Sequence, residues 1–165
     1  MALVVAVGAE RTSTIVACLV DTNVLVYRHD PRSPEKQARA IALLRDGLAS
    51  DEIRIPHQAI VEFVAATSRP LPGSRISLLT PEESRREAEE LINQFPIMHP
   101  SDSVLRLALR GAAAYQLSWF DAHLWAYAEH YGLDVLYSED FQHERRYGTV
   151  QVLNPFASEA EGASR

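Results

Sequence analysis

The chain has 165 residues, of which 47% are hydrophobic, with one cysteine and 22 acidic against 16 basic side chains. This length and composition predict one ordinary globular domain and leave no room for a separate regulatory module. The lone cysteine excludes a disulfide framework and a cysteine-based zinc site, and the net charge of −6 argues against a generic, charge-driven nucleic-acid binder.

The first half of the chain has the pattern of alternating strands and helices. Residues 15–20 form a continuous apolar, β-rich run, which is typical of a strand buried on both faces of a parallel sheet. Polar residues from Asp21 onward end this run, and Ser33 followed by Pro34 predicts a helix start with Ser33 as its cap. We expect a strand over 15–20, a helix over 34–50, a strand over 53–55, a helix over 57–68 and an irregular loop over 69–80.

Capping signals mark the helices of the second half. Residues 80–83 (Thr-Pro-Glu-Glu) form a capping box with proline in the first turn. Ser101 and Ser118 are predicted N-caps, and Gly132 is predicted to end the last helix. The expected order is a helix over 81–94, a strand over 95–99, helices over 102–116 and 119–131, and strands over 135–137 and 150–153.

This alternation predicts an α/β fold, with a mainly parallel central sheet flanked by helices in a single three-layer domain. We assign the domain to residues 15–156, with 1–14 as an N-terminal extension, either a misplaced gene start or an added edge segment, and 157–165 as a flexible tail. No apolar run approaches the ~20 residues of a membrane-spanning helix. We therefore expect a cytoplasmic protein, outside the membrane, in keeping with the single cysteine.

Four acidic residues fall at strand ends or at helix positions that face them. Asp21 follows the first strand, Glu62 interrupts an apolar helix, Asp121 lies in the first turn of a late helix, and Asp140 follows the strand over 135–137. Taken singly, the three aspartates have a structural explanation as turn or cap residues, and Glu62 as an exposed charge on a solvated stripe. In α/β folds, however, the active site lies beyond the carboxyl ends of the strands, where all four would meet.

The surroundings of two of these acids carry further information. Small neighbours on the same helix face leave room beside the carboxylate of Glu62. Asp121 directly follows Trp119 and Phe120, so we expect aromatic side chains to bury its surroundings. The residues three and four positions from Glu62 are Gln58, Ala59, Ala65 and Ala66.

Converging carboxylates repel one another unless a cation compensates them. Some would hold protons at neutral pH, and a divalent cation removes that penalty. Oxygen-only ligands suit Mg²⁺ or Mn²⁺ better than zinc. Such a cluster supports phosphodiester hydrolysis, in which one or two metals activate water and stabilise the leaving oxygen.

Five short motifs, taken in their order and spacing, extend this interpretation. They are Leu19-Val20-Asp21-Thr22-Asn23-Val24-Leu25, Ile60-Val61-Glu62-Phe63, Ser118-Trp119-Phe120-Asp121-Ala122, Leu136-Tyr137-Ser138-Glu139-Asp140-Phe141 and Val152-Leu153-Asn154-Pro155-Phe156. Over residues 18–156 the chain resembles PIN-domain ribonucleases, specifically the VapC-type toxins of bacterial toxin–antitoxin pairs. It departs from them in its start, since twenty residues precede Asp21 where the family usually has only a few.

The resemblance implies a PIN-like fold and a set of site residues. The four acids would be both catalytic and ligands of Mg²⁺ or Mn²⁺, with polar supports beside them. Glu139 is a weaker candidate because its side chain is expected to point away from Asp140. The implied catalytic and metal-binding residues are Asp21, Glu62, Asp121 and Asp140, and the implied supporting residues are Asn23, Ser138 and Thr22.

The resemblance also implies an activity and partners. The protein would be a metal-dependent endoribonuclease that cleaves single-stranded or loop RNA, act as a homodimer, and be silenced by a VapB-like antitoxin whose C-terminal segment blocks the acidic pocket. The loop from Arg69 to Thr80 is a candidate contact for substrate or antitoxin, because it is an irregular stretch between two helices.

Cationic residues near the acids are candidates for holding the RNA backbone, although an ordinary solvated face is the alternative. Taking the four site carboxylates from the 22 acids leaves 18 against 16 cations, or −2, so we expect RNA affinity to depend on the metal more than on a basic surface. The candidates are Arg28, Arg32 and Lys36 after Asp21, and Arg145 and Arg146 after Asp140.

Two rival functions stay open beside the nuclease. A phosphatase with an aspartate nucleophile would share Asp21, but it needs a second acid where Asn23 stands and usually a downstream lysine, whereas the only lysine, Lys36, lies in the first predicted helix. A non-catalytic PIN module that binds RNA or a partner protein is the other rival, and the presence of all four acids favours the nuclease over it. Phosphate-binding G-x-G-x-x-G and G-K-[ST] motifs are absent from the sequence.

Overall fold

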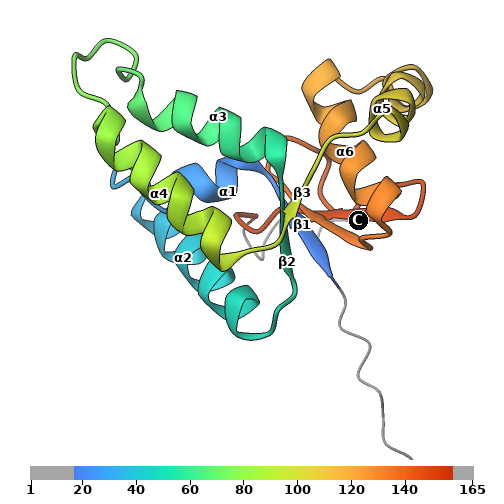
Figure 1. The fold of residues 1–165 in the computed structure, drawn as a ribbon, viewed down its shortest axis with the longest axis horizontal. Helices are drawn as coiled ribbons and strands as arrows, with labels where there is room; N and C mark the ends of the chain where they lie inside the picture. Colours follow the sequence, from blue (N-terminus) through green and yellow to red (C-terminus); the bar gives the residue numbers. More distant parts are fainter. Residues whose placement is uncertain (1–16, 158–165) are drawn as a thin grey trace, which may run out of the picture.

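A computed structural model describes residues 17–157. Six helices and six strands make up this part of the chain, with helices on both sides of one sheet (Figure 1). The strands are β1 (Cys18–Val20), β2 (Ile53–Pro56), β3 (Ile97–Met98), β4 (Val135–Tyr137), β5 (Arg146–Tyr147) and β6 (Val150–Leu153). The helices are α1 (Thr22–Tyr27), α2 (Pro34–Ala49), α3 (His57–Ser68), α4 (Pro81–Gln94), α5 (Asp102–Tyr115) and α6 (Trp119–Tyr131).

The order of strands across the sheet is β3-β2-β1-β4-β6-β5. All neighbouring pairs are parallel except β5 and β6, which are antiparallel. The chain moves outward from β1 to β3 on one side, then returns to place β4 beside β1 and continues to the other edge. The order of strands therefore reverses between β1 and β4, the position where open α/β sheets bind their ligands.

Two apolar cores cover the two faces of the sheet, because alternate residues of each strand point to opposite sides. On the side of α5 and α6, Leu19 and Leu136 pack in one cluster with Trp125. On the side of α1 to α4, the neighbouring Val20 packs with Phe63 in a second cluster. The all-apolar sequence of β1 follows from this arrangement, since the strand is buried from both sides. The predicted three-layer α/β architecture with a mainly parallel sheet is confirmed.

Most predicted elements are confirmed within a residue or two, and the capping box at Thr80 and the caps at Ser101 and Ser118 form as expected. Two elements were not predicted. One is the short helix α1, which has Asp21 as its N-cap and forms where the sequence indicated only a break. The other is β5, which pairs with β6 as a short antiparallel edge strand. Both are too short to show a periodic pattern in the sequence.

Some predicted boundaries and details were wrong. The strand expected over 95–99 is limited to β3, because only two of its residues pair with β2. Ser33 stands at the start of α2 but its side chain makes no capping hydrogen bond. The strand predicted over 15–20 is seen from Cys18, and its first two residues, the proposed extension 1–14 and all but the first residue of the proposed tail 157–165 lie outside the described residues.

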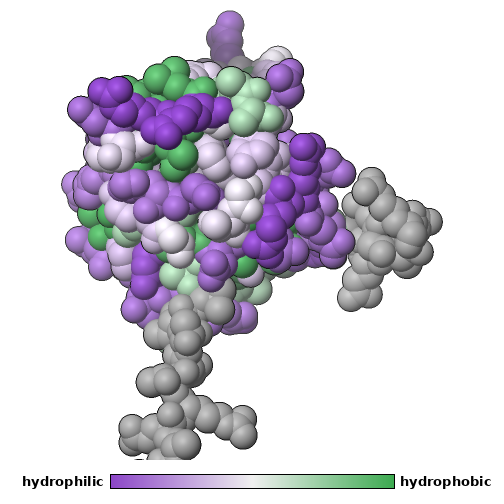
Figure 2. Space-filling view, turned by 90° about the vertical axis from the view of Figure 1, so that its right-hand side faces the viewer, coloured by the Kyte–Doolittle hydropathy of each residue, from purple (hydrophilic) through white to green (hydrophobic). Residues whose placement is uncertain are grey.

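No helix in the described part of the chain is long and apolar enough to cross a membrane. The side of the molecule viewed in Figure 2 is largely hydrophilic, with hydrophobic residues gathered in a few patches between polar ones. Large exposed hydrophobic side chains include Leu109 of α5, Ile92 of α4 and Phe120 of α6.

Close packing of α5 against α6 places the acid that α6 carries. Gly111 of α5 is buried, and a methyl group added to it would come within 2.2 Å of the Trp125 ring on α6. Trp125 is held in turn by a hydrogen bond from its indole nitrogen to the carbonyl oxygen of Tyr147, at 2.9 Å. The two helices therefore approach as closely as they do because residue 111 has no side chain.

We predict that Gly111→Ala lowers the free energy of unfolding by about 1–3 kcal/mol, because the added methyl group overpacks the helix interface. The midpoint of urea unfolding measures this loss. Ala113→Gln, on the exposed side of the same helix, is the control and should change stability by less than about 0.5 kcal/mol. A Gly111→Ala protein as stable as the parent would contradict the packing described.

Candidate active site

The pairing of β1 with β4 brings the first site residues together. Val20 lies opposite Tyr137 in the register, so the two strands end level, and the backbone nitrogen of Asp21 donates to the carbonyl oxygen of Tyr137 at 2.9 Å. The next residue after each strand, Asp21 or Ser138, therefore stands at the same edge of the sheet. The hydroxyl of Ser138 is fully buried and donates to the Asp21 carboxylate at 2.6 Å.

Three donors in all hold the carboxylate of Asp21. Besides Ser138, the side-chain amide of Asn23 donates to it at 3.0 Å and the backbone nitrogen of Thr22 caps the start of α1 through it. Asp21 is only 7% exposed. The residue thus has the capping role expected for an aspartate at this position and also presents a fixed, buried carboxylate.

The carboxylate of Glu62 is held from two elements. The hydroxyl of Thr22, on α1, donates to one of its oxygens at 2.8 Å. The side-chain amide of Gln58, one turn earlier on α3, donates to the other oxygen at 2.8 Å and to the carbonyl oxygen of Phe120 at 3.4 Å. Glu62 is therefore fixed in position and linked through Gln58 to the start of α6. These contacts argue against the alternative that Glu62 is an exposed charge on a solvated stripe.

Asp121 lies in the first turn of α6, as predicted, with Ser118 as the N-cap. The Ser118 hydroxyl accepts from the backbone nitrogen of Asp121 at 3.2 Å and donates to its carboxylate at 2.7 Å. The expectation that aromatic residues bury this acid was wrong. Trp119 is 44% and Phe120 66% exposed, so neither ring is packed into a core, although Asp121 itself is half-buried.

Asp140 completes the group and Glu139 turns away from it. The Asn23 amide that donates to Asp21 also lies 3.2 Å from the Asp140 carboxylate, and so links the two acids. Glu139 instead forms an ion pair with Lys36 and accepts from the Tyr27 hydroxyl at 2.6 Å. This lysine is engaged away from the four acids, and Asn23 acts as a hydrogen-bond donor, which gives no support to an aspartate phosphatase.

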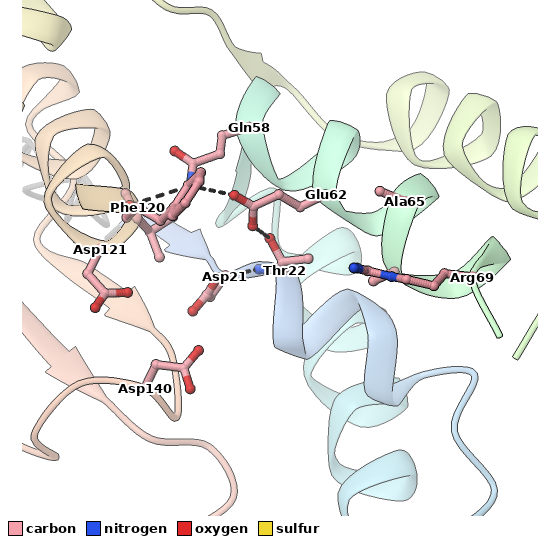
Figure 3. Close-up of a pocket in the computed structure, with 11 residues that line it drawn as sticks. Asp21, Thr22, Gln58, Glu62, Ala65, Arg69, Phe120, Asp121 and Asp140 are labelled. Atoms are coloured by element: carbon pink, nitrogen blue, oxygen red, sulfur yellow. Dashed lines mark hydrogen bonds between the residues drawn. The ribbon is translucent and has the colours of Figure 1, made fainter. Parts of the chain in front are cut away.

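One cavity of about 500 Å³ collects the four acids between α3 and α6 (Figure 3). Small and apolar residues form part of its wall, and Arg69 is the cation among its lining residues. A second cavity, of about 350 Å³, lies on the other side of Asp21 and includes Tyr27 and Arg32. The first cavity is lined by Asp21, Thr22, Gln58, Glu62, Ala65, Ala66, Arg69, Phe120, Asp121, Leu124 and Asp140.

The environment of the acids disfavours charge on two of them. The pKa of Asp21 is raised to about 7, mainly by burial and also by the nearby acids Asp140 and Glu62. Hydrogen bonds from Ser138 and from the backbone of Thr22 act in the opposite direction. Burial also raises the pKa of Asp121, and the same two acids add to this effect while the Ser118 hydroxyl opposes it. Without a compensating cation, Asp21 therefore remains partly protonated near neutral pH.

The donor set fits a hard divalent cation that keeps part of its water shell. Within residues 17–157, no three His, Cys, Asp or Glu side chains lie close enough together to form a ready-made ligand cage. Mg²⁺ does not need one, since it commonly binds through one or two carboxylates and retains several waters. The buried side-chain oxygen of Asn23, which has no hydrogen-bond partner in the described structure, adds a further oxygen beside Asp21.

The arginines proposed to hold RNA are spread over different environments. Arg32 lines the second cavity and pairs with Asp30 at 2.7 Å. Arg28 lies 3.7 Å from Glu87 of α4. Arg145 lies over the ring of Tyr147, and Arg146 donates to a backbone carbonyl within the β5–β6 turn.

Three lining residues were not singled out for the cavity from the sequence. Gln58 precedes Glu62 by one helical turn, a spacing that could have indicated a partner for the carboxylate. Arg69 was expected only as part of a contact loop. Phe120 was taken as a residue that buries Asp121, and nothing in its local sequence indicates that it is exposed.

These observations define the class of the molecule: an α/β protein with an acidic cavity where the strand order reverses. The chain belongs to the PIN domain family, since the family's sequence model matches residues 18–148. No curated protein sequence matches the chain.

Solved structures of toxin–antitoxin complexes share this fold. A chain of DNA-bound VapBC from Salmonella typhimurium superposes with a TM-score of 0.60 at 13% identity, covering 83% of this chain and 96% of that one. A toxin–antitoxin complex from Klebsiella pneumoniae gives 0.59 at 18% identity, covering 84% and 98%. The toxin VapC20 of Mycobacterium tuberculosis, which cleaves the sarcin-ricin loop, gives 0.52 at 13% identity, covering 76% and 90%.

We predict that the metal-free protein loses stability as the pH rises from about 4 to about 7. Because the pKa of Asp21 is about 7 in the folded chain and 3.8 in an unfolded one, ionisation favours the unfolded state across this range. The difference between the two values corresponds to an upper bound on the order of 4 kcal/mol. Urea unfolding in the presence of a chelator, repeated across this pH range, measures the decline.

Asp21→Asn should flatten that decline, since the amide does not titrate. The control is Asp46→Asn on α2, a solvent-exposed acid that should leave the pH dependence unchanged. If the parent and Asp21→Asn proteins lose stability in parallel between pH 4 and 7, burial of the Asp21 carboxylate is not the cause.

Proposed function

We propose that this chain is a metal-dependent endoribonuclease of the VapC type, the toxin component of a VapBC-like toxin–antitoxin system. The observation that carries the proposal is the convergence of Asp21, Glu62, Asp121 and Asp140 on one cavity at the reversal of strand order. A cavity lined by four carboxylates, with the pKa values of Asp21 and Asp121 raised, is poorly suited to bind an anion by itself. It is well suited to a divalent cation that in turn binds a phosphodiester.

Some residues of the chain would bind the cation, and others would hold these ligands in position. Asp21, with Asp121 and Asp140, would hold Mg²⁺ or Mn²⁺, directly or through water, and Glu62 would complete the acidic set. Bound there, the cation would supply Lewis-acid activation of water and stabilise charge on the leaving oxygen. Asp21 and Asp121, whose pKa values are raised, would have to ionise to act as ligands, so binding at these two residues would be coupled to proton release.

Three polar residues keep the acids in place for this role. Ser138 and Asn23 hold the Asp21 carboxylate with donated hydrogen bonds, and Asn23 reaches Asp140 as well. Thr22 orients Glu62. Because donors occupy these carboxylate oxygens, the acids have little freedom to rotate, and a bound phosphodiester would meet a fixed arrangement.

Partners follow from the similarity to known complexes. The similar chains from Salmonella and Klebsiella come from toxin–antitoxin complexes, and the first is bound to DNA. We therefore propose a VapB-like antitoxin as the cognate partner, whose C-terminal segment occupies the acidic cavity, a homodimeric toxin, RNA as the substrate and the cytoplasm as the site of action.

We expect the purified protein to cleave single-stranded or loop RNA in the presence of Mg²⁺ or Mn²⁺ and to lose this activity in a chelator. Asp21→Asn and Asp121→Asn should each lower the rate by at least about 100-fold, since each removes a charge on which cation binding depends. Gel analysis of end-labelled RNA measures the rate. Asp46→Asn is the matched control and should cleave like the parent.

The outcomes separate the nuclease from its rivals. Undiminished cleavage by Asp21→Asn would indicate a contaminating nuclease and contradict the proposal. Binding of RNA or a partner without any cleavage would favour a non-catalytic module. Release of phosphate from a small phosphomonoester, with RNA left intact, would favour the aspartate phosphatase.

The antitoxin proposal has its own test. A short open reading frame next to this gene, with a DNA-binding start, should encode a protein that co-purifies with this chain and suppresses its cleavage of RNA. A neighbouring product that forms no complex and leaves cleavage unchanged would contradict the assignment to a toxin–antitoxin pair but not the nuclease activity.

A further inference from the structure

Phe120 is the most exposed aromatic residue at the acidic cavity, with 66% of its surface accessible. Core packing does not account for a ring in this position. Its neighbour Trp119 differs, because its ring packs edge-on against His123 with the centroids 4.5 Å apart. The hydrogen bond from Gln58 to the carbonyl oxygen of Phe120 ties this turn of α6 to α3 across the cavity. The ring therefore stands beside Asp121 on a fixed piece of backbone.

Arg69 lies in the same cavity, just after the end of α3. Within residues 17–157 it has no ion-pair partner, whereas Arg28 and Arg32 are both paired with acids. Figure 3 shows its side chain extending from the end of α3 toward Thr22, into the space beside the acids. A guanidinium that is free to bind and faces a cavity suits the phosphate group of a ligand.

The wall between these two residues leaves space for a flat ligand. Ala65 and Ala66 of α3 line the cavity between Glu62 and Arg69, and their methyl groups fill little of it. The cavity thus offers an aromatic face on α6, a small apolar wall on α3 and an unpaired cation at the end of α3. A nucleotide has the matching parts: a planar base that stacks on an aromatic ring and a phosphate that pairs with arginine.

We propose that Phe120 and Arg69 form a subsite for one unpaired nucleotide that flanks the bond to be cleaved, with the base stacked on the Phe120 ring and its phosphate held by Arg69. This inference rests on the proposed function and names the feature of the RNA that the cavity selects. A base inside a duplex has both faces covered by its neighbours and cannot stack on Phe120. Selection for unpaired RNA therefore follows from the aromatic contact.

A protein side chain is the other ligand that an exposed phenyl ring could bind. The chemistry of the cavity favours the nucleotide, because the ring shares its cavity with four acids proposed to bind a cation and with an unpaired arginine. A strand whose phosphodiester lies at the acids carries a base and a further phosphate on each side of it. One ligand can therefore satisfy the acids, the ring and the arginine together.

The test measures binding, so that it does not depend on turnover. With all four acids intact and with Ca²⁺ in place of Mg²⁺, so that a divalent cation is present while turnover is slowed, we would titrate the protein into a fluorescein-labelled six-nucleotide adenylate RNA and follow anisotropy. Phe120→Ala should weaken binding about 10-fold. Phe120→Leu should weaken it nearly as much, because leucine is apolar but has no ring on which a base can stack. Phe120→Trp, which keeps an aromatic ring, should bind within about 2-fold of the parent. Ile92→Ala, an exposed apolar residue on α4, is the matched control and should not change binding.

Arg69 is tested through the salt dependence of the same binding. Arg69→Ala should reduce the slope of log affinity against log salt concentration by about 0.7, the value expected when one phosphate contact to a single strand is lost. Arg45→Ala, an exposed arginine on α2, should leave the slope unchanged. Arg69→Lys should retain the slope, since it keeps the charge.

The outcomes distinguish this inference from the proposed function. If Phe120→Ala binds the RNA as tightly as the parent, the stacking subsite is overturned, and Phe120 is left as a contact for a protein. Metal-dependent cleavage by the otherwise unchanged chain would still stand in that case. Conversely, an inactive parent whose RNA binding depends on Phe120 and Arg69 would support the subsite while contradicting the nuclease.

Discussion

The register in which the parallel strands β1 and β4 pair determines where the rest of the site lies. Because Val20 pairs with Tyr137, the residues that follow them, Asp21 and Ser138, meet at hydrogen-bond distance beyond the sheet. From this edge Asp21 starts α1, and α1 carries Thr22 toward Glu62 and Asn23 toward Asp140. A shift of one residue in this register would move every side chain of a strand to the other face. The acidic cavity is thus a consequence of how two central strands pair.

Holding several carboxylates in one cavity costs stability, and the structure shows how the chain limits that cost. Hydroxyl and amide donors from Ser138, Asn23, Thr22 and Gln58 reach the buried or half-buried acids, and each donated hydrogen bond favours the charged form. The raised pKa of Asp21 indicates that these bonds do not compensate fully. The remaining repulsion is the physical reason why the site is suited to a divalent cation. It also explains how a chain with net charge −6 can be proposed to act on RNA, since much of its excess negative charge belongs to the pocket.

Helices from both layers form the walls of the cavity. On one side, α3 supplies Glu62 and the small wall of Ala65 and Ala66, while on the other α6 supplies Asp121 and the exposed ring of Phe120. The position of α6 depends on its close contact with α5, where Gly111 lies against Trp125. The similar toxin–antitoxin structures share the fold at 12–18% identity.

The fold class and most element boundaries could be predicted from the amino-acid order, because a strand buried on two faces requires a continuous apolar run. The convergence of the four acids could be predicted as well, because residues that follow parallel strands meet at one edge of the sheet. Local patterns carry such information, as the capping box at Thr80 and the cap at Ser118 also illustrate. The short helix α1, the exposure of Phe120, the turn of Glu139 toward Lys36 and the place of Arg69 in the cavity could not be predicted in this way. Each depends on which residues from distant parts of the chain become neighbours, and a side chain's partners across the fold are set by packing and register, which no local pattern records.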